Sequence, residues 1–129
     1  MDGAERGMMP DPLRSLRIAL SGLGHLIRSE RSSLWHLAAS VGAIILGLVL
    51  QLSMEEWRWI LIAAALVWAG EAFNTAFERL GDAVTLDQNP DVGRAKDVAA
   101  AGVLICAVTA ALIALSIFGP HLADWFYRD

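Results

Sequence analysis

Three polar side chains share one face of an otherwise apolar segment. Glu71, Asn74 and Glu78 stand at positions i, i+3 and i+7, a spacing that places them on the same side of a helix. Asp82 continues this face at i+11 if the helix extends that far. A carboxylate within a bilayer costs about 2.5–3.5 kcal/mol even on the mildest scale, so an acid in such a segment indicates a functional site.

A second charged cluster and two further acids complete the candidate set. Lys96 and Asp97 stand at the start of the next apolar segment. Asp87, either a solvated loop acid or a nucleotide contact, lies in the connection before them, and Glu30 precedes the first apolar segment. Lysine binds phosphate oxygens, and Mg²⁺ is bound by one or two carboxylates together with substrate phosphates. Acids on one helix that face a Lys–Asp pair therefore predict metal-phosphate chemistry at a membrane surface.

The residue types assign separate roles within this chemistry. Glu78 and Glu30 are the candidate Mg²⁺ ligands, and Lys96 is the candidate donor to phosphate oxygens. Glu71 lies roughly 21 Å along a helix from Trp57 at 1.5 Å per residue, which places it toward the cytoplasmic edge of the bilayer. Because Glu71 is deeper and less solvated than Glu78, it is the candidate general base that takes a proton from a lipid hydroxyl.

Other interpretations of these residues stay open. Glu71 and Asn74 could be polar contacts between helices without a chemical role. The charges of Glu78 and Lys96 could lie at the membrane edge without a function. His36 is interpreted as an interfacial histidine or a helix contact rather than a ligand. The set as a whole, on one face and on one side of the membrane, favours a functional site over coincidence.

The elements that must position these side chains are helices that cross a membrane. Hydrophobic residues make up 56% of the 129-residue chain, and the stretches 34–52 and 98–119 carry no formal charge. Each stretch is long enough to span about 30 Å of hydrocarbon as a helix. The middle apolar stretch spans only if its helix continues through Glu71. We therefore predict a membrane domain over 13–120, with transmembrane helices at 33–52, 57–81 and 95–118.

The segments outside these spans complete the predicted organisation. Residues 13–30 carry Leu20 and Ile27 at helical spacing opposite arginines, which is typical of an amphipathic helix that lies in the membrane interface. A soluble helix packed on a cytoplasmic partner is the alternative. Residues 1–12 are expected to form a disordered tail, and 121–129 a tail on the outer side. The predicted fold class is an all-α membrane protein with one N-terminal amphipathic interfacial helix and three transmembrane helices.

The distribution of positive charge predicts the orientation. Five of the ten Lys and Arg residues precede residue 34, three lie between residues 79 and 96, and two lie elsewhere. Lys and Arg are enriched on the cytoplasmic side of membranes. We therefore expect a multi-pass protein whose N-terminus and candidate site face the cytoplasm, where nucleotides are.

These motifs resemble the small bacterial integral-membrane diacylglycerol kinases, a family that also includes the undecaprenol kinases. The segment Glu-Ala-Phe-Asn-Thr-Ala-Phe-Glu at 71–78 resembles the family signature Glu-x-x-Asn-[Ser/Thr]-Ala-x-Glu. Asp82 and the segment Gly-Arg-Ala-Lys-Asp at 93–97 follow at the family spacing. Glu30-Arg31 followed by His36 resembles the element that opens the first span of the undecaprenol-type members. The resemblance covers about residues 13–115.

The resemblance implies a trimeric helix bundle in a bacterial inner (cytoplasmic) membrane, with active sites shared between neighbouring subunits. It implies transfer of the γ-phosphate of MgATP to a lipid hydroxyl, with Glu71 as the general base. The other residues it implies in the site are Glu30 and Glu78 for the metal and the nucleotide, Asn74 and Asp82 in support, and Lys96 and Asp97 for ATP.

We therefore expect an ATP-dependent lipid kinase whose first-choice acceptor is diacylglycerol, which gives phosphatidic acid, with undecaprenol as the alternative acceptor. The rival from another class is a non-enzymatic, ion- or proton-coupled small membrane protein in which Glu71 would be a carrier site. A non-catalytic assembly subunit is a third interpretation. The expected partners are a membrane lipid, ATP with Mg²⁺, and further copies of the chain, with no nucleic acid.

Overall fold

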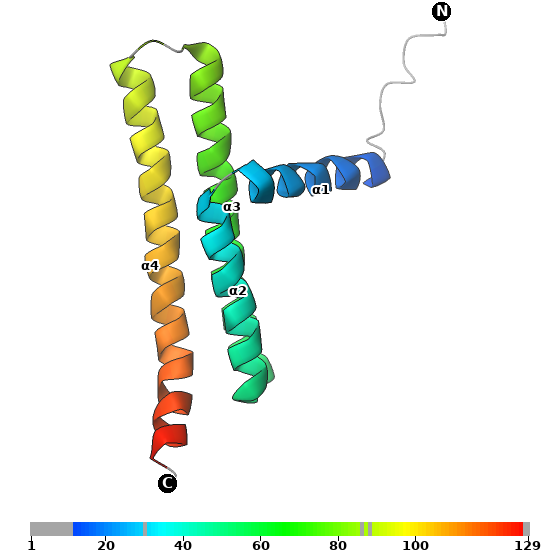
Figure 1. The fold of residues 1–129 in the computed structure, drawn as a ribbon, viewed down its shortest axis with the longest axis vertical. Helices are drawn as coiled ribbons and strands as arrows, with labels where there is room; N and C mark the ends of the chain where they lie inside the picture. Colours follow the sequence, from blue (N-terminus) through cyan, green and yellow to red (C-terminus); the bar gives the residue numbers. More distant parts are fainter. Residues whose placement is uncertain (1–11, 30, 86, 88, 128–129) are drawn as a thin grey trace, which may run out of the picture.

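Four helices make up the described part of the chain. The computed structural model describes residues 12–29, 31–85, 87 and 89–127. The helices are α1 (Pro12–Ser29), α2 (Arg31–Val49), α3 (Met54–Val84) and α4 (Pro90–Phe126). In Figure 1, α3 and α4 run side by side as a long antiparallel pair, α2 lies against α3, and α1 projects away from the bundle. The all-α fold class is confirmed, while the tail predicted at 1–12 lies outside the described residues apart from Pro12.

Two of these helices are long and apolar enough to cross a membrane. They are α3 and α4. Helices α1 and α2 meet the same criterion only together, as a pair bent by 103°, so the described residues supply two spans, or three if the bent pair counts as one. Three separate spans and a trimer therefore stay predictions.

The beginnings of α3 and α4 follow from their capping residues. The Ser53 hydroxyl accepts the backbone N–H of Glu56 at 3.3 Å, while the Glu56 carboxylate accepts the backbone N–H of Ser53 at 2.7 Å. This reciprocal capping box starts α3 at Met54, earlier than the residue 57 predicted for the span. Asn89 caps α4 by accepting the N–H groups of the second and third helical residues, with Pro90 in the first position. An Asn cap followed by Pro in the first helical position is a typical helix start.

Helix α4 extends beyond the predicted span. It continues through Pro120 to Phe126, so most of the segment expected as an outer tail, 121–129, is helical. A proline inside a helix removes one backbone hydrogen bond. Here apolar side chains on both sides of Pro120 pack in the core: Ile117 and Phe118 are buried, and Leu122 packs against them. This packing accounts for the continuation of the helix.

The hydrophobic core lies at the end of the bundle where α2 joins α3, which we call the core end. Leu52, Ile60, Ile117 and Phe118 are buried there. The Trp57 indole covers Gly47, where an added Cβ would lie 2.7 Å from the ring. Trp57 therefore packs between α2 and α3, and this packing requires a glycine at position 47 of α2.

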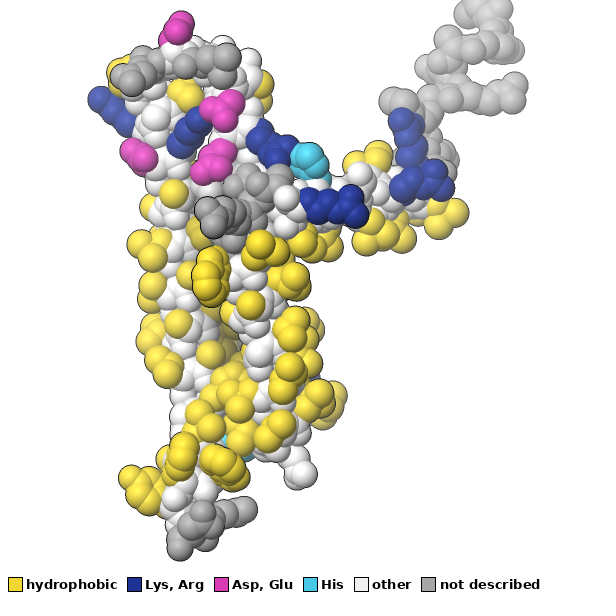
Figure 2. Space-filling view, viewed as in Figure 1, with side chains coloured by type: hydrophobic (Ala, Val, Ile, Leu, Met, Phe, Trp, Pro, Cys, Tyr) yellow, Lys and Arg dark blue, Asp and Glu magenta, His cyan; other side chains and the backbone are white. Residues whose placement is uncertain are grey.

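The opposite end of the bundle carries the charged residues of the candidate site, and we call it the charged end. Figure 2 shows the acidic and basic side chains gathered there and an apolar surface along the rest of the bundle. Along α1, the basic side chains lie on the side turned toward the charged end and the hydrophobic ones on the side turned toward the apolar surface. Leu13, Leu16 and Leu20 are exposed. This is the arrangement that an interfacial helix requires.

A single residue at the end of α2 adopts a left-handed conformation. Gln51 has a φ of 55°. The N–H of Leu52 donates to the Gly47 carbonyl at 3.0 Å and that of Gln51 to the Leu48 carbonyl at 3.3 Å, which defines a Schellman motif with glutamine where glycine is usual.

We expect Gln51→Gly to stabilise the protein by about 1 kcal/mol, because a residue with a Cβ pays roughly that much for this conformation. Reversible unfolding in mixed detergent micelles measures the change. Gln51→Ala retains the Cβ and is the matched control. An equal gain from both substitutions would contradict the backbone explanation.

Candidate functional site

The polar residues predicted to share a face do so, and their burial falls along α3 toward the charged end. Glu71 is 3% exposed, Asn74 and Glu78 are partly buried, and Asp82 is exposed. Thr75, buried one turn after Glu71, belongs to the same face. The graded face expected from the sequence is thus present, from a buried carboxylate at one end to a solvated one at the other.

The buried carboxylate of Glu71 faces a histidine of α2. The Nε2 atom of His36 lies 3.6 Å from Oε2 of Glu71, and the imidazole is 22% exposed. The two residues form an ion pair when the imidazole is protonated. A buried carboxylate needs a polar partner because the apolar surroundings solvate it poorly. His36 is therefore a helix contact, as interpreted from the sequence, and specifically a contact to the candidate base.

Asn74 and Glu78 form the next layer. The Asn74 amide donates from Nδ2 to Oε1 of Glu78 at 3.3 Å, while Oδ1 of Asn74 is buried and accepts no hydrogen bond from the described residues. A buried acceptor without a donor is costly, and an amide oxygen beside a carboxylate suits a hard divalent cation. The donor set therefore fits Mg²⁺ at this layer.

The second expected metal ligand, Glu30, lies outside the described residues. Within the described part of the chain, no three His, Cys, Asp or Glu residues are grouped closely enough to hold a metal ion. A magnesium site made of Glu78 and Asn74 would thus need oxygen ligands from phosphate, or from residues beyond this set.

Asp82 and Lys96 join α3 to α4 at the charged end. The Lys96 ammonium lies 2.5 Å from Oδ1 of Asp82. The lysine side chain crosses Gly81, where an added Cβ would lie 2.8 Å from its Cε and 3.0 Å from Cγ1 of Val92. The absence of a side chain at Gly81 thus gives Lys96 its path to Asp82, a feature that the sequence analysis missed.

Two predicted site residues lie apart from these contacts. Asp97 is exposed and makes no hydrogen bond or ion pair with the rest of the described chain. Asp87 is exposed in the connection between α3 and α4, where its backbone N–H donates to the Thr85 hydroxyl at 3.1 Å. Both are free to meet a ligand from solution, and neither touches Glu71, Glu78 or Lys96.

A hydrogen-bond chain behind His36 was not predicted. The indole N–H of Trp68 donates to the Ser40 hydroxyl at 3.1 Å, and this hydroxyl donates to the His36 carbonyl at 2.8 Å. Trp68 on α3 thereby fixes the turn of α2 that carries His36. In the sequence, Trp68 and Ser40 appear as ordinary members of apolar spans, so no sequence signal distinguishes them. A second unpredicted contact joins Arg79 of α3 to His25 of α1.

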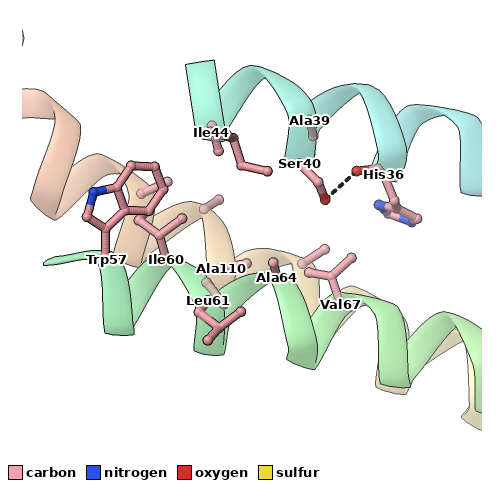
Figure 3. A pocket seen from close by; sticks show the side chains of 15 residues that line it. His36, Ala39, Ser40, Ile44, Trp57, Ile60, Leu61, Ala64, Val67 and Ala110 are labelled. Carbon is pink, nitrogen blue, oxygen red and sulfur yellow. Dashed lines mark hydrogen bonds between the residues drawn. The ribbon is translucent and has the colours of Figure 1, made fainter. Parts of the chain in front are cut away.

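An apolar groove of about 370 Å³ runs between α2, α3 and α4 and ends at His36. Figure 3 shows Trp57 and His36 at its two ends, with Ala64 and Val67 of α3 on one wall and Ala39 and Ile44 of α2 on the other. Glu71 does not line the groove itself, but His36, which does, lies 3.6 Å from its carboxylate.

Comparison with known proteins gives two matches. Residues 17–118 match the family model described as prokaryotic diacylglycerol kinase. The undecaprenol kinase of Bacillus subtilis (strain 168) is 36% identical over 101 residues, which cover 78% of this chain and 82% of that protein. No solved structure matches the chain. The span matched by the family model includes every residue of the candidate site.

We expect Gly81→Ala to displace the Lys96 ammonium from Asp82 and to weaken nucleotide binding about tenfold, since a charge-assisted contact contributes roughly 1.5 kcal/mol or more. Titration with a fluorescent ATP analogue measures the affinity. Gly93→Ala is the matched control, because nothing lies within 4 Å of an added Cβ there. Equal affinities for both variants would contradict the role given to Gly81.

Proposed function

This chain belongs to the prokaryotic diacylglycerol kinase family, and from this premise we propose which side chains transfer the phosphate and which lipid accepts it. Membership makes the chain a membrane-embedded lipid kinase that uses ATP as the phosphate donor. The residue roles, the metal, the acceptor and the assembly are our proposals. The observation that carries them is the buried Glu71–His36 contact at the end of the apolar groove.

Glu71 acts as the general base. Its carboxylate accepts the proton of the lipid hydroxyl while the hydroxyl oxygen forms a bond to the γ-phosphorus of ATP. The bond from this phosphorus to the bridging oxygen breaks, and ADP leaves with the electron pair. Proton transfer to a positioned side chain contributes typically about 10²–10⁴-fold to a rate. Burial of Glu71 beside the groove supports this role, because the hydroxyl of a lipid held there would meet its carboxylate.

Glu78 and Asn74 are the proposed Mg²⁺ ligands of this chain, with Glu30 as a further carboxylate. The unpaired oxygen of Asn74 beside Glu78 supports this proposal. When bound, Mg²⁺ neutralises charge on the phosphate oxygens. Lys96 contacts the phosphates as a point charge, and Asp82 holds its ammonium in place. Asp97 and Asp87 provide further contacts to the nucleotide.

The preferred acceptor is an undecaprenol-type polyprenol. The 36% identical relative named for that activity supports this choice. The histidine at position 36 also supports it, because His36 belongs to the motif that resembles the undecaprenol-type members. Diacylglycerol, the first choice from the sequence, is the second candidate and has the family description in its favour. The two acceptors share a primary hydroxyl and an apolar tail.

The proposed assembly is a homotrimer in a bacterial inner membrane, with its charged end in the cytoplasm. Apolar side chains of α4, among them Leu104, Val108 and Leu112, are exposed and suit lipid or a neighbouring subunit. The clustering of positive charge at one end supports the orientation. An ion- or proton-coupled protein would not transfer phosphate from ATP to lipid, so a direct assay separates the two functions.

Glu71→Gln is expected to lower kcat by about 10²-fold or more while nucleotide affinity is retained, because the amide cannot accept the proton. Labelled ATP, Mg²⁺ and each lipid in detergent micelles provide the assay. Glu55→Gln, at the exposed opposite end of α3, is the matched control. Unchanged turnover in Glu71→Gln would refute the base assignment, and a wild-type protein inactive on both lipids would refute the proposed transfer.

Ala64→Phe is expected to raise the KM for lipid about tenfold and to leave the KM for ATP unchanged, because the added ring fills the groove and displaces hydrocarbon contacts. Ala65→Phe places the same ring on the exposed neighbouring position and is the control. If Ala64→Phe changed the oligomer size in detergent and left the lipid KM unchanged, the groove would hold a neighbouring helix instead.

A further inference from the structure

We infer that the groove selects its acceptor by withholding hydrogen-bond donors, and that Ser40 and Trp68 are the residues that determine this specificity. The inference rests on the proposed function, because it requires the groove to hold the acceptor. The chemical class that it favours is a long-chain alcohol without carbonyl groups near the hydroxyl. Diacylglycerol, which carries two ester carbonyls beside its hydroxyl, is the class that it disfavours.

The first step is an account of the donors along the groove. Among the fifteen side chains that line it, those with an N–H or O–H group are His36, Ser40 and Trp57, and the others are aliphatic. Trp57 lies at the other end of the groove from His36 (Figure 3). Near the reacting end, the donors are therefore those of His36 and Ser40.

The donor groups of both residues face other groups of the protein. The Ser40 hydroxyl donates its hydrogen to the His36 carbonyl at 2.8 Å (Figure 3), within its own helix. The indole N–H of Trp68, which reaches the same place from α3, is taken up by the Ser40 oxygen at 3.1 Å. The Nε2 atom of His36 faces the Glu71 carboxylate. The hydrogen-bond chain thus occupies the Ser40 and Trp68 donors, and the remaining donor group beside the groove, the His36 imidazole, faces the Glu71 carboxylate.

The consequence is different for the two acceptor classes. A carbonyl that leaves water without finding a donor is disfavoured by about ten- to a hundredfold in affinity. A polyprenol brings one hydroxyl, which Glu71 can accept, followed by hydrocarbon that needs no donor. A site can reject a ligand by leaving its polar groups unpaired as effectively as it accepts another by contact. Selectivity for the alcohol without esters follows.

The hydrogen bond between Trp68 and Ser40 provides a direct test, because removing its acceptor frees its donor. Trp68 does not line the groove itself, but its indole N–H reaches Ser40, which does. In Ser40→Ala this N–H loses its partner and can meet a carbonyl held in the groove. We expect the ratio of kcat/KM for diacylglycerol to kcat/KM for undecaprenol to rise about tenfold. Trp68→Phe removes the N–H itself, so this ratio should not rise.

The double variant Ser40→Ala/Trp68→Phe separates the effect of the freed indole donor on lipid specificity from the structural effect of losing the Ser40 hydroxyl. It lacks both the hydroxyl and the freed donor, so the ratio should return to the wild-type value. Ser116→Ala is the matched control, because the Ser116 hydroxyl also donates within its own helix, to the Ile113 carbonyl at 2.8 Å, but lies outside the groove. It should leave the ratio unchanged.

Three outcomes would overturn the inference while phosphate transfer itself stands. The first is a wild-type protein that prefers diacylglycerol. The second is a ratio that Ser40→Ala leaves unchanged, which includes an equal loss of activity with both lipids, as a purely structural bond would give. The third is the same rise in the double variant as in Ser40→Ala. A wild-type protein that phosphorylates neither lipid would instead refute the proposed function.

Discussion

The burial of one carboxylate, that of Glu71, is the constraint on which the rest of the structure depends. A carboxylate among apolar helices is unfavourable unless a polar group meets it. The chain supplies His36 from α2, so these two helices must cross at this position. The packing of Trp57 over Gly47 and the hydrogen bond from Trp68 to Ser40 hold α2 in that position. The contacts of Trp57 and Trp68 with α2 thus help to keep His36 beside Glu71.

Sequence reasoning found the residues of the candidate site but few of the contacts among them. Helical spacing alone places Glu71, Asn74 and Glu78 on one face, and Asn89-Pro90 marks a helix start through local backbone chemistry, so both were predictable. Contacts between helices depend on how the helices are rotated and how far they slide, which a single sequence does not encode locally. The chain from Trp68 through Ser40 to His36 belongs to this second kind.

The remaining differences between prediction and structure have physical causes of their own. Helix α4 passes Pro120 because Ile117 and Leu122 pack on either side, so tertiary packing outweighs a local helix breaker. The predicted span 57–81 ends at Gly81, yet α3 continues to Val84, and the missing side chain of Gly81 leaves space for the side chain of Lys96. A glycine is compatible both with close packing of a neighbouring side chain and with the end of a helix, and only the three-dimensional contacts distinguish the two.

The uneven distribution of the core has a mechanical consequence. Buried side chains hold α2, α3 and α4 together at the core end, whereas at the charged end α3 and α4 pack against each other without α2 (Figure 1). Thermal motion of such a bundle concentrates at the weakly joined end, because separating the helices there exposes little apolar surface. Such motion would give a lipid lateral access from the surrounding leaflet at the charged end, while the core end stays rigid.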